Sequence, residues 1–268
     1  MKWVIDSTGR FKWRPYYEQE ELDIECERIV SEFLKRKYGE IRFPLSTDDL
    51  TVMIERDTSE LDLYADLSGV GEDIEGLTDF FPHKKPAVRI AAELSLDDER
   101  YHRLRITLAH EYGHVMFHTF LWDYNQTGKS SMNLARKLSV QRRKYSNFRK
   151  KYLPEQGTRA GFRCMQSRLL DAPYSDWMEW QASYACGAFL MPLSAIRNLI
   201  LRKMREWDIL TWIPCESGQA TEMMSLVSEM FDVSSDIACI RLLKLDFLQK
   251  LDQDNNTSID TKLASISF

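Results

Sequence analysis

The spacing of apolar and polar residues predicts two helices at the start of the chain. In residues 18–38, apolar side chains recur three or four positions apart, with charged side chains between them and a glycine after them. Residues 44–56 predict a second helix, for which Ser46 or Thr47 is the expected N-cap. We therefore assign residues 1–60 to an N-terminal helical scaffold.

From residue 61 the spacing of apolar residues changes to every second position. Residues 61–67 alternate in this way, as a half-buried strand does. Residues 77–81 and 87–91 predict two more short strands, joined by the turn sequence PHKKP. Residues 152–174, which contain several Gly and Pro, predict irregular structure. The pattern thus places a small sheet directly before the most apolar helix of the chain.

That helix is predicted at residues 105–118, which read RITLAHEYGHVMFH and are apolar nearly all round, as in a buried central helix. His110, Glu111 and His114 form the sequence HExxH. Residues four apart lie one turn apart on the same helix face, so the two imidazoles can point at one metal ion. The Glu111 carboxylate can reach a metal-bound water without being a ligand itself. This is the geometry of a zinc hydrolase.

The third ligand is expected from residues 176–192, whose apolar side chains recur at helical spacing. Glu179 projects from this helix beside small residues, and a buried carboxylate needs a cation. Two histidines and one glutamate bind zinc and leave a fourth position for water. His118 lies eight residues after His110 and lacks the glycine-containing turn that returns a third histidine to zinc, so we do not expect it to be a ligand.

The two motifs together resemble the ImmA/IrrE family of bacterial metalloproteases. The resemblance rests on RITLAHEYGH, on Glu179 with the WQA that follows it, and on the closing LMP, and it spans residues 61–192. It implies that His110, His114 and Glu179 hold Zn²⁺ and that Glu111 is the general base of a gluzincin-type endopeptidase.

Two features depart from the pattern of that family. The residue one turn after the third ligand, usually Asn or Asp, is Ser183, which is our candidate for a contact that orients a zinc histidine. His114 and Glu179 are 65 residues apart, which is longer than expected for compact members. The added length is a basic insertion at residues 124–154.

The fold class expected from these motifs is α+β. A zincin-like metalloprotease core, residues 61–192, would carry a small mixed sheet packed on the HExxH helix. In zinc proteases the edge strand of such a sheet can bind an extended substrate as one more strand, although a purely structural hairpin explains the pattern equally well. No substrate-binding residue is assigned, and Tyr112, Tyr174 and Tyr184 are the candidates for stabilising an oxyanion.

Residues 193–248 predict a C-terminal helical segment, in which Ser234 or Ser235 caps the last helix. The sequence FDVSSDIACIRLLKLDFL in this segment resembles the helix-turn-helix-like part that follows the protease core in some family members. A helical pair packing on the protease explains the same pattern without DNA, and we favour it. Residues 249–268 are polar and predict a mobile tail.

Composition bears on the size of the core and on the compartment expected for the protein. The chain has 268 residues, 44% of them hydrophobic, which is enough to bury a large core. Its five cysteines include no CxxC pair, which favours a reducing compartment over a disulfide framework. Because neither a signal peptide nor a run of 18 apolar residues is present, we expect a soluble, cytoplasmic protein with no membrane contact.

The net charge of −5 is unevenly distributed along the chain. Residues 124–154 contain nine Lys or Arg and no Asp or Glu. Such a stretch is usually a solvated helix face, although it could attract DNA or an acidic partner. DNA binding is not favoured.

The family resemblance implies a regulatory enzyme that cleaves a specific cytoplasmic protein, typically a helix-turn-helix repressor of a mobile element or stress regulon. The alternative is a DNA-binding or protein-interaction regulator in which the zinc site is not catalytic.

Overall fold

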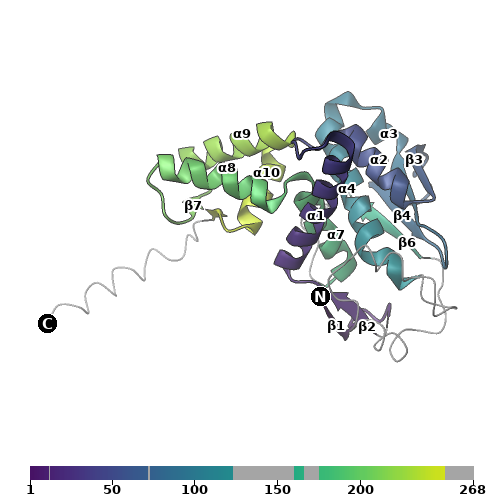
Figure 1. The fold of residues 1–268 in the computed structure, drawn as a ribbon. Coiled ribbons are helices and arrows are strands. Elements are labelled where there is room, and N and C mark those ends of the chain that lie inside the picture. Colours follow the sequence, from purple (N-terminus) through teal and green to yellow (C-terminus); the bar gives the residue numbers. More distant parts are fainter. Residues whose placement is uncertain (12, 72, 123–159, 166–174, 251–268) are drawn as a thin grey trace. The chain divides into compact units, whose positions relative to one another are not determined.

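The structure is a computed structural model in which the chain divides into two compact units, Met1–Ile196 and Arg197–Phe268 (Figure 1). Helices and small sheets are mixed in it, in keeping with the α+β class expected from the sequence. The residues that it describes are 1–11, 13–71, 73–122, 160–165 and 175–250. The basic insertion at residues 124–154 and the predicted tail beyond residue 250 lie outside them.

The first unit begins with a two-stranded antiparallel ribbon, β1 (Lys2–Ile5) and β2 (Trp13–Tyr16). The apolar pattern did not predict this ribbon, because strands of four residues are too short to show an alternation. The first predicted helix is confirmed as α1 (Gln19–Tyr38), which ends where Gly39 adopts a left-handed φ of 81°.

The second predicted helix is confirmed as α2 (Thr47–Asp57). Of the two proposed caps, the structure selects Ser46, whose hydroxyl accepts a hydrogen bond from the Asp49 N–H at 3.0 Å.

The main sheet has four strands in the order β3-β5-β4-β6. β3 runs parallel to β5, whereas β4 is antiparallel to both of its neighbours. The predicted hairpin around PHKKP is confirmed, since it joins β4 to β5. The bounds of the strands are β3 (Glu60–Ala65), β4 (Ile74–Phe80), β5 (Ala87–Ala91) and β6 (Ala160–Met165).

Strand β6 corrects the prediction of irregular structure between residues 152 and 174. It pairs with β4 over its whole length, and such pairing with a distant strand can decide a conformation that the local sequence does not signal. β4 therefore lies between β5 and β6 and is not an edge. The edges of the sheet, among the described strands, are β3 and β6, so neither strand of the hairpin lies at an edge where an extended substrate could be added.

Helix α4 (Tyr101–His118) is the centre of the first unit, as its apolar sequence predicted, and its side chains from Arg105 onward are all buried. A short helix α3 (Ala92–Ser95) and two 3₁₀ turns, η1 (Asp98–Arg100) and η2 (Thr119–Leu121), flank it. The buried Arg105 guanidinium ties α4 to the start of α2, where it donates to the Leu45 carbonyl at 2.9 Å.

Helix α7 (Trp177–Leu190) packs along α4, while β4 contacts α4 as well and α1 contacts α7 (Figure 1). The N-terminal ribbon is tied to the start of α7, because Arg10 forms a bidentate ion pair with the Asp176 carboxylate, with N–O distances of 2.7 and 3.0 Å. The indole N–H of Trp177 donates to Asp6 at 3.1 Å. The HExxH helix and the Glu179 helix are thus neighbours in one core.

The second unit is mainly helical. The predicted break between two helices is confirmed, and Ser234 is the cap of the last helix, since its hydroxyl accepts from the Ile237 N–H at 3.4 Å. Its elements are α8 (Leu193–Glu206), which begins in the first unit, β7 (Ile213–Pro214), α9 (Gly218–Phe231), α10 (Ser235–Lys244) and β8 (Leu248–Gln249). Among the described helices none is by itself long and apolar enough to cross a membrane; α7 and α8 meet that test only as a pair bent by 62°.

Candidate metal centre

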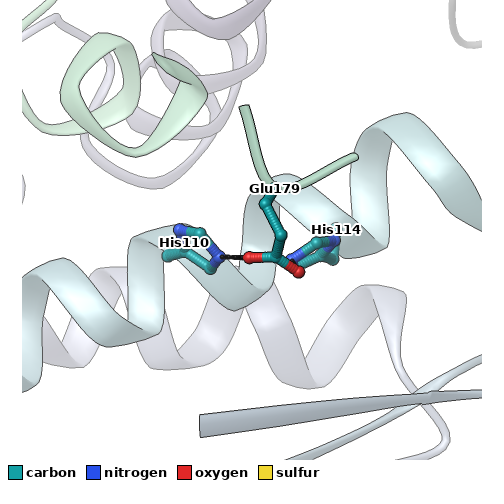
Figure 2. A group of neighbouring side chains, drawn as sticks. All are labelled: His110, His114 and Glu179. Carbon is teal, nitrogen blue, oxygen red and sulfur yellow. Dashed lines mark hydrogen bonds and ion pairs between the residues drawn. The ribbon is translucent and has the colours of Figure 1, made fainter. Parts of the chain in front are cut away.

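Three side chains from two helices converge at the contact between α4 and α7. Figure 2 shows Glu179 reaching from α7 to the imidazoles of His110 and His114 on α4. One ligand atom from each residue lies within 4.8 Å of the others. The Glu179 carboxylate is 3.2 Å from Nε2 of His110 and 3.3 Å from Nε2 of His114. The structure therefore brings together the three residues that the sequence suggested as ligands.

All three residues are buried: both histidines are fully inaccessible and Glu179 is 6% exposed. Burial alone would raise the pKa of Glu179, but His114 and His110 hold it well below its usual range. Burial would likewise lower the pKa of His110, yet Cys186, Glu179 and Glu111 raise it to about 10. A carboxylate at this depth is stable only with positive charge beside it.

The donor set fits a metal ion. Two imidazole nitrogens and a carboxylate oxygen are ligands that divalent transition metals share, and three protein ligands leave a further coordination position open. Without an ion, the raised pKa of His110 keeps a protonated imidazole beside the Glu179 carboxylate. The group can therefore hold a metal ion, although the geometry alone does not specify which one.

Glu111 lies beside this group and contacts the sheet rather than the ligands. Thr78 of β4 donates its hydroxyl hydrogen to Oε2 of Glu111, whereas Oε1 has no hydrogen-bond partner in the described part of the chain. Gly76 of β4 faces the same carboxylate, and a Cβ at residue 76 would stand only 2.5 Å from Oε1. Burial raises the pKa of Glu111, although His114 and His110 oppose this. The sequence did not point to Thr78 or Gly76, since their link to Glu111 depends on sheet packing.

His118 contacts the group through His114 and is not one of the three residues that could hold the metal ion together. Its Nδ1 lies 3.0 Å from Nδ1 of His114, and its Nε2 lies 3.0 Å from Oε1 of Gln181. The Gln181 amide nitrogen in turn donates to the Pro15 carbonyl of β2 at 3.0 Å. Burial lowers the pKa of His118 well below its usual value.

Ser183, the residue expected to orient a zinc histidine, is buried in α7. Its carbonyl accepts a hydrogen bond from the Cys186 thiol at 3.1 Å. The proposed contact between Ser183 and a zinc histidine stays a prediction. Cys186 is close enough to raise the pKa of His110, although Nδ1 of His110 has no well-formed hydrogen bond to any described residue. The sequence analysis did not single out Cys186 as a neighbour of His110. It named Gln181 only as part of the WQA motif.

Two of the tyrosines considered as oxyanion stabilisers have structural roles instead. The Tyr112 hydroxyl donates to Asp57 of α2 at 2.9 Å, and the Tyr184 hydroxyl donates to Asp23 of α1 at 2.7 Å. Burial and Asp57 raise the pKa of Tyr112 well above its usual value. Both hydroxyls fasten the core helices to one another. Tyr174 lies outside the described residues.

Comparison of the sequence with models of known protein families gives no match. Comparison with curated proteins gives no significant match either. The candidate metal centre therefore rests on its geometry alone, and the ImmA/IrrE resemblance stays a hypothesis.

Proposed function

We propose that the protein is a zinc-dependent endopeptidase with a zincin-like core. The observation that carries this proposal is the buried Glu111 carboxylate, one oxygen of which is free of partners among the described residues, next to a group of two histidines and one glutamate. A purely structural metal site has no use for such a carboxylate. A base that works beside a metal needs one.

Zinc bound by His110, His114 and Glu179 would supply Lewis-acid chemistry. It would polarise a peptide carbonyl and lower the pKa of a bound water towards neutrality. Glu111 takes the proton from the attacking water through Oε1, while Thr78 holds Oε2 in place. Water oxygen bonds to the carbonyl carbon, the C–N bond breaks, and Glu111 returns the proton to the leaving amine. The raised pKa of Glu111 makes its carboxylate a stronger base, which favours taking the proton from water.

The substrate class follows from the family resemblance and is part of the proposal. Enzymes of that type cleave one or few cytoplasmic proteins, typically helix-turn-helix repressors of mobile elements or stress regulons. The basic insertion at residues 124–154 would supply a positive field for capturing an acidic face of the target. General substrates such as casein should be cut poorly.

The test is co-expression with each helix-turn-helix repressor encoded beside the gene, followed by mass spectrometry of the repressor. The wild-type protein should cut the repressor at one peptide bond and so produce two repressor fragments. Glu111→Gln preserves size and hydrogen bonding but removes the basic carboxylate, so cleavage should fall at least about 100-fold while zinc and fold are retained. If the wild type and Glu111→Gln give the same biological output in cells and the repressor is not cleaved, the alternative of a regulator with a non-catalytic zinc site should replace this proposal.

A further inference from the structure

Four groups form a continuous chain of hydrogen bonds that begins at the metal group and ends on the backbone of the N-terminal ribbon. The chain runs from His114 to His118, then to Gln181 of α7 and finally to the carbonyl of Pro15 in β2. Each heavy-atom separation is 3.0 Å. All four residues are buried.

The last member of the chain fixes the direction of the two bonds nearest to it. A carbonyl oxygen can only accept, so the nitrogen of the Gln181 amide must face Pro15. The amide oxygen must then face His118, where it also can only accept, and Nε2 of His118 must carry a hydrogen. The Pro15 carbonyl thus determines that Gln181 donates to Pro15 and that His118 donates to Gln181.

The same reasoning settles the contact between the two imidazoles. His118 is fully buried between the His114 imidazole and the Gln181 amide, and a neutral His118 has its single ring hydrogen on Nε2, towards Gln181. With its hydrogen on Nε2, the neutral ring presents a lone pair at Nδ1. Nδ1 of His114 must therefore be the donor. When Nε2 of His114 binds a metal ion, Nδ1 is the nitrogen that carries the hydrogen, so the relay fits that form of the ring.

We propose that His118 and Gln181 are positioning residues that hold His114 in the tautomer and orientation in which Nε2 binds the metal. The inference rests on the metal site of the proposed function. It goes beyond that function because it makes the N-terminal ribbon part of the metal centre. A ligating histidine ordinarily donates its other N–H to a carboxylate, a carbonyl or water. Here a second histidine relays that bond to a carbonyl.

The ribbon is built to keep the Pro15 carbonyl in place. Trp3 of β1 is paired with Pro15 across the ribbon. Phe11 packs edge-on against Trp177 with ring centroids 6.2 Å apart, and the Arg10–Asp176 ion pair fastens the ribbon to the start of α7. Because Gln181 lies one turn after Trp177 on α7, the anchored ribbon and the amide keep a fixed separation.

A matched pair of substitutions tests the relay through the affinity for Zn²⁺, measured by competition with a chromophoric chelator. His118→Phe keeps a ring in the cavity but removes the acceptor for His114, so the affinity should fall about 10- to 100-fold. His118→Asn places an amide oxygen near the position of Nδ1 and should restore most of the loss. His102→Phe makes the same change elsewhere on α4 and should leave the affinity unchanged.

A second measurement on the wild-type protein decides the question if His118→Phe does not fold. In the ¹⁵N-histidine spectrum of the zinc-loaded chain, His118 should be neutral with its hydrogen on Nε2, and His114 should carry its hydrogen on Nδ1. A hydrogen on Nδ1 of His118, or a doubly protonated ring, would overturn the relay. Equal zinc affinity of His118→Phe and the wild type would also overturn it.

The outcome separates the relay from the function on which it rests. A wild-type chain that does not bind Zn²⁺ contradicts both. A chain that binds Zn²⁺ tightly, with His118→Phe equal to it, contradicts the relay alone. Loss of affinity in His118→Phe, with recovery in His118→Asn, supports the relay whether or not a substrate has been found.

Discussion

Gly113 of α4 lies directly against the backbone of Ala182 in α7. A Cβ at residue 113 would stand 3.1 Å from Cα and 3.2 Å from the carbonyl oxygen of Ala182. The neighbours of these residues are two of the candidate ligands: His114 follows Gly113, and Glu179 lies about one turn before Ala182. The close approach of the two helices therefore sets the distance over which Glu179 must reach the histidines.

Gly113→Ala should push α4 and α7 apart, because backbone atoms cannot yield as a flexible side chain can. We expect the free energy of unfolding to fall by about 1–3 kcal/mol, as for other overpacked sites, and the affinity for Zn²⁺ to fall with it. Urea unfolding and chelator competition measure the two effects. Gly69→Ala is the matched control, since a Cβ there meets nothing within 4 Å. Unchanged stability and affinity in Gly113→Ala would show that the helix contact does not set the ligand spacing.

Gly76→Ala should act on the base and not on the ligands. The added methyl group would lie 2.5 Å from Oε1 and 3.0 Å from Cδ of Glu111, so the carboxylate must leave its position beside Thr78. A displacement of about 1 Å in a catalytic group can cost about 100-fold in rate, and we expect kcat to fall by that order. Zinc content should stay that of the wild type. A Gly76→Ala enzyme with normal kcat would indicate that the observed position of Glu111 is not the working one.

Zinc binding should become tighter as pH rises and should release a proton. The pKa of His110 in the metal-free group is about 10, so the ring is protonated at neutral pH, whereas a ligand must be neutral. Binding therefore competes with a proton at every pH below about 10, and the affinity should rise roughly tenfold per pH unit between pH 6 and 8. Calorimetry in buffers of different ionisation enthalpy detects the released proton. Binding enthalpies that are independent of the buffer would contradict a protonated His110.

The sequence predicted the group of two histidines and one glutamate because both motifs are local. HExxH depends only on the helical repeat of α4, and Glu179 stood out as an acid among small apolar residues of α7. The helices α1 and α2 and the cap Ser234 were predictable for the same reason. In each case the residues that decide the conformation lie within one or two turns of each other.

The supporting residues could not be predicted in this way, since they depend on contacts between distant segments. Thr78 and Gly76 meet Glu111 only because β4 packs on α4. Gln181 meets Pro15 across 166 residues, and Pro15 belongs to a strand too short to show a period. β6 has its conformation through pairing with β4. Sequence patterns therefore identified the three side chains that could hold a metal ion but not the residues that keep them in place.

Metal analysis of the purified chain tests the central claim most directly, since the function and the relay both depend on one site formed by His110, His114 and Glu179. The wild type and Glu111→Gln should each contain about one zinc per chain after dialysis against a weak chelator. Glu179→Ala should lose most of it, because the two histidines alone form an incomplete set. Full zinc content in Glu179→Ala would contradict the ligand assignment, and absence of zinc from the wild type would contradict the whole account.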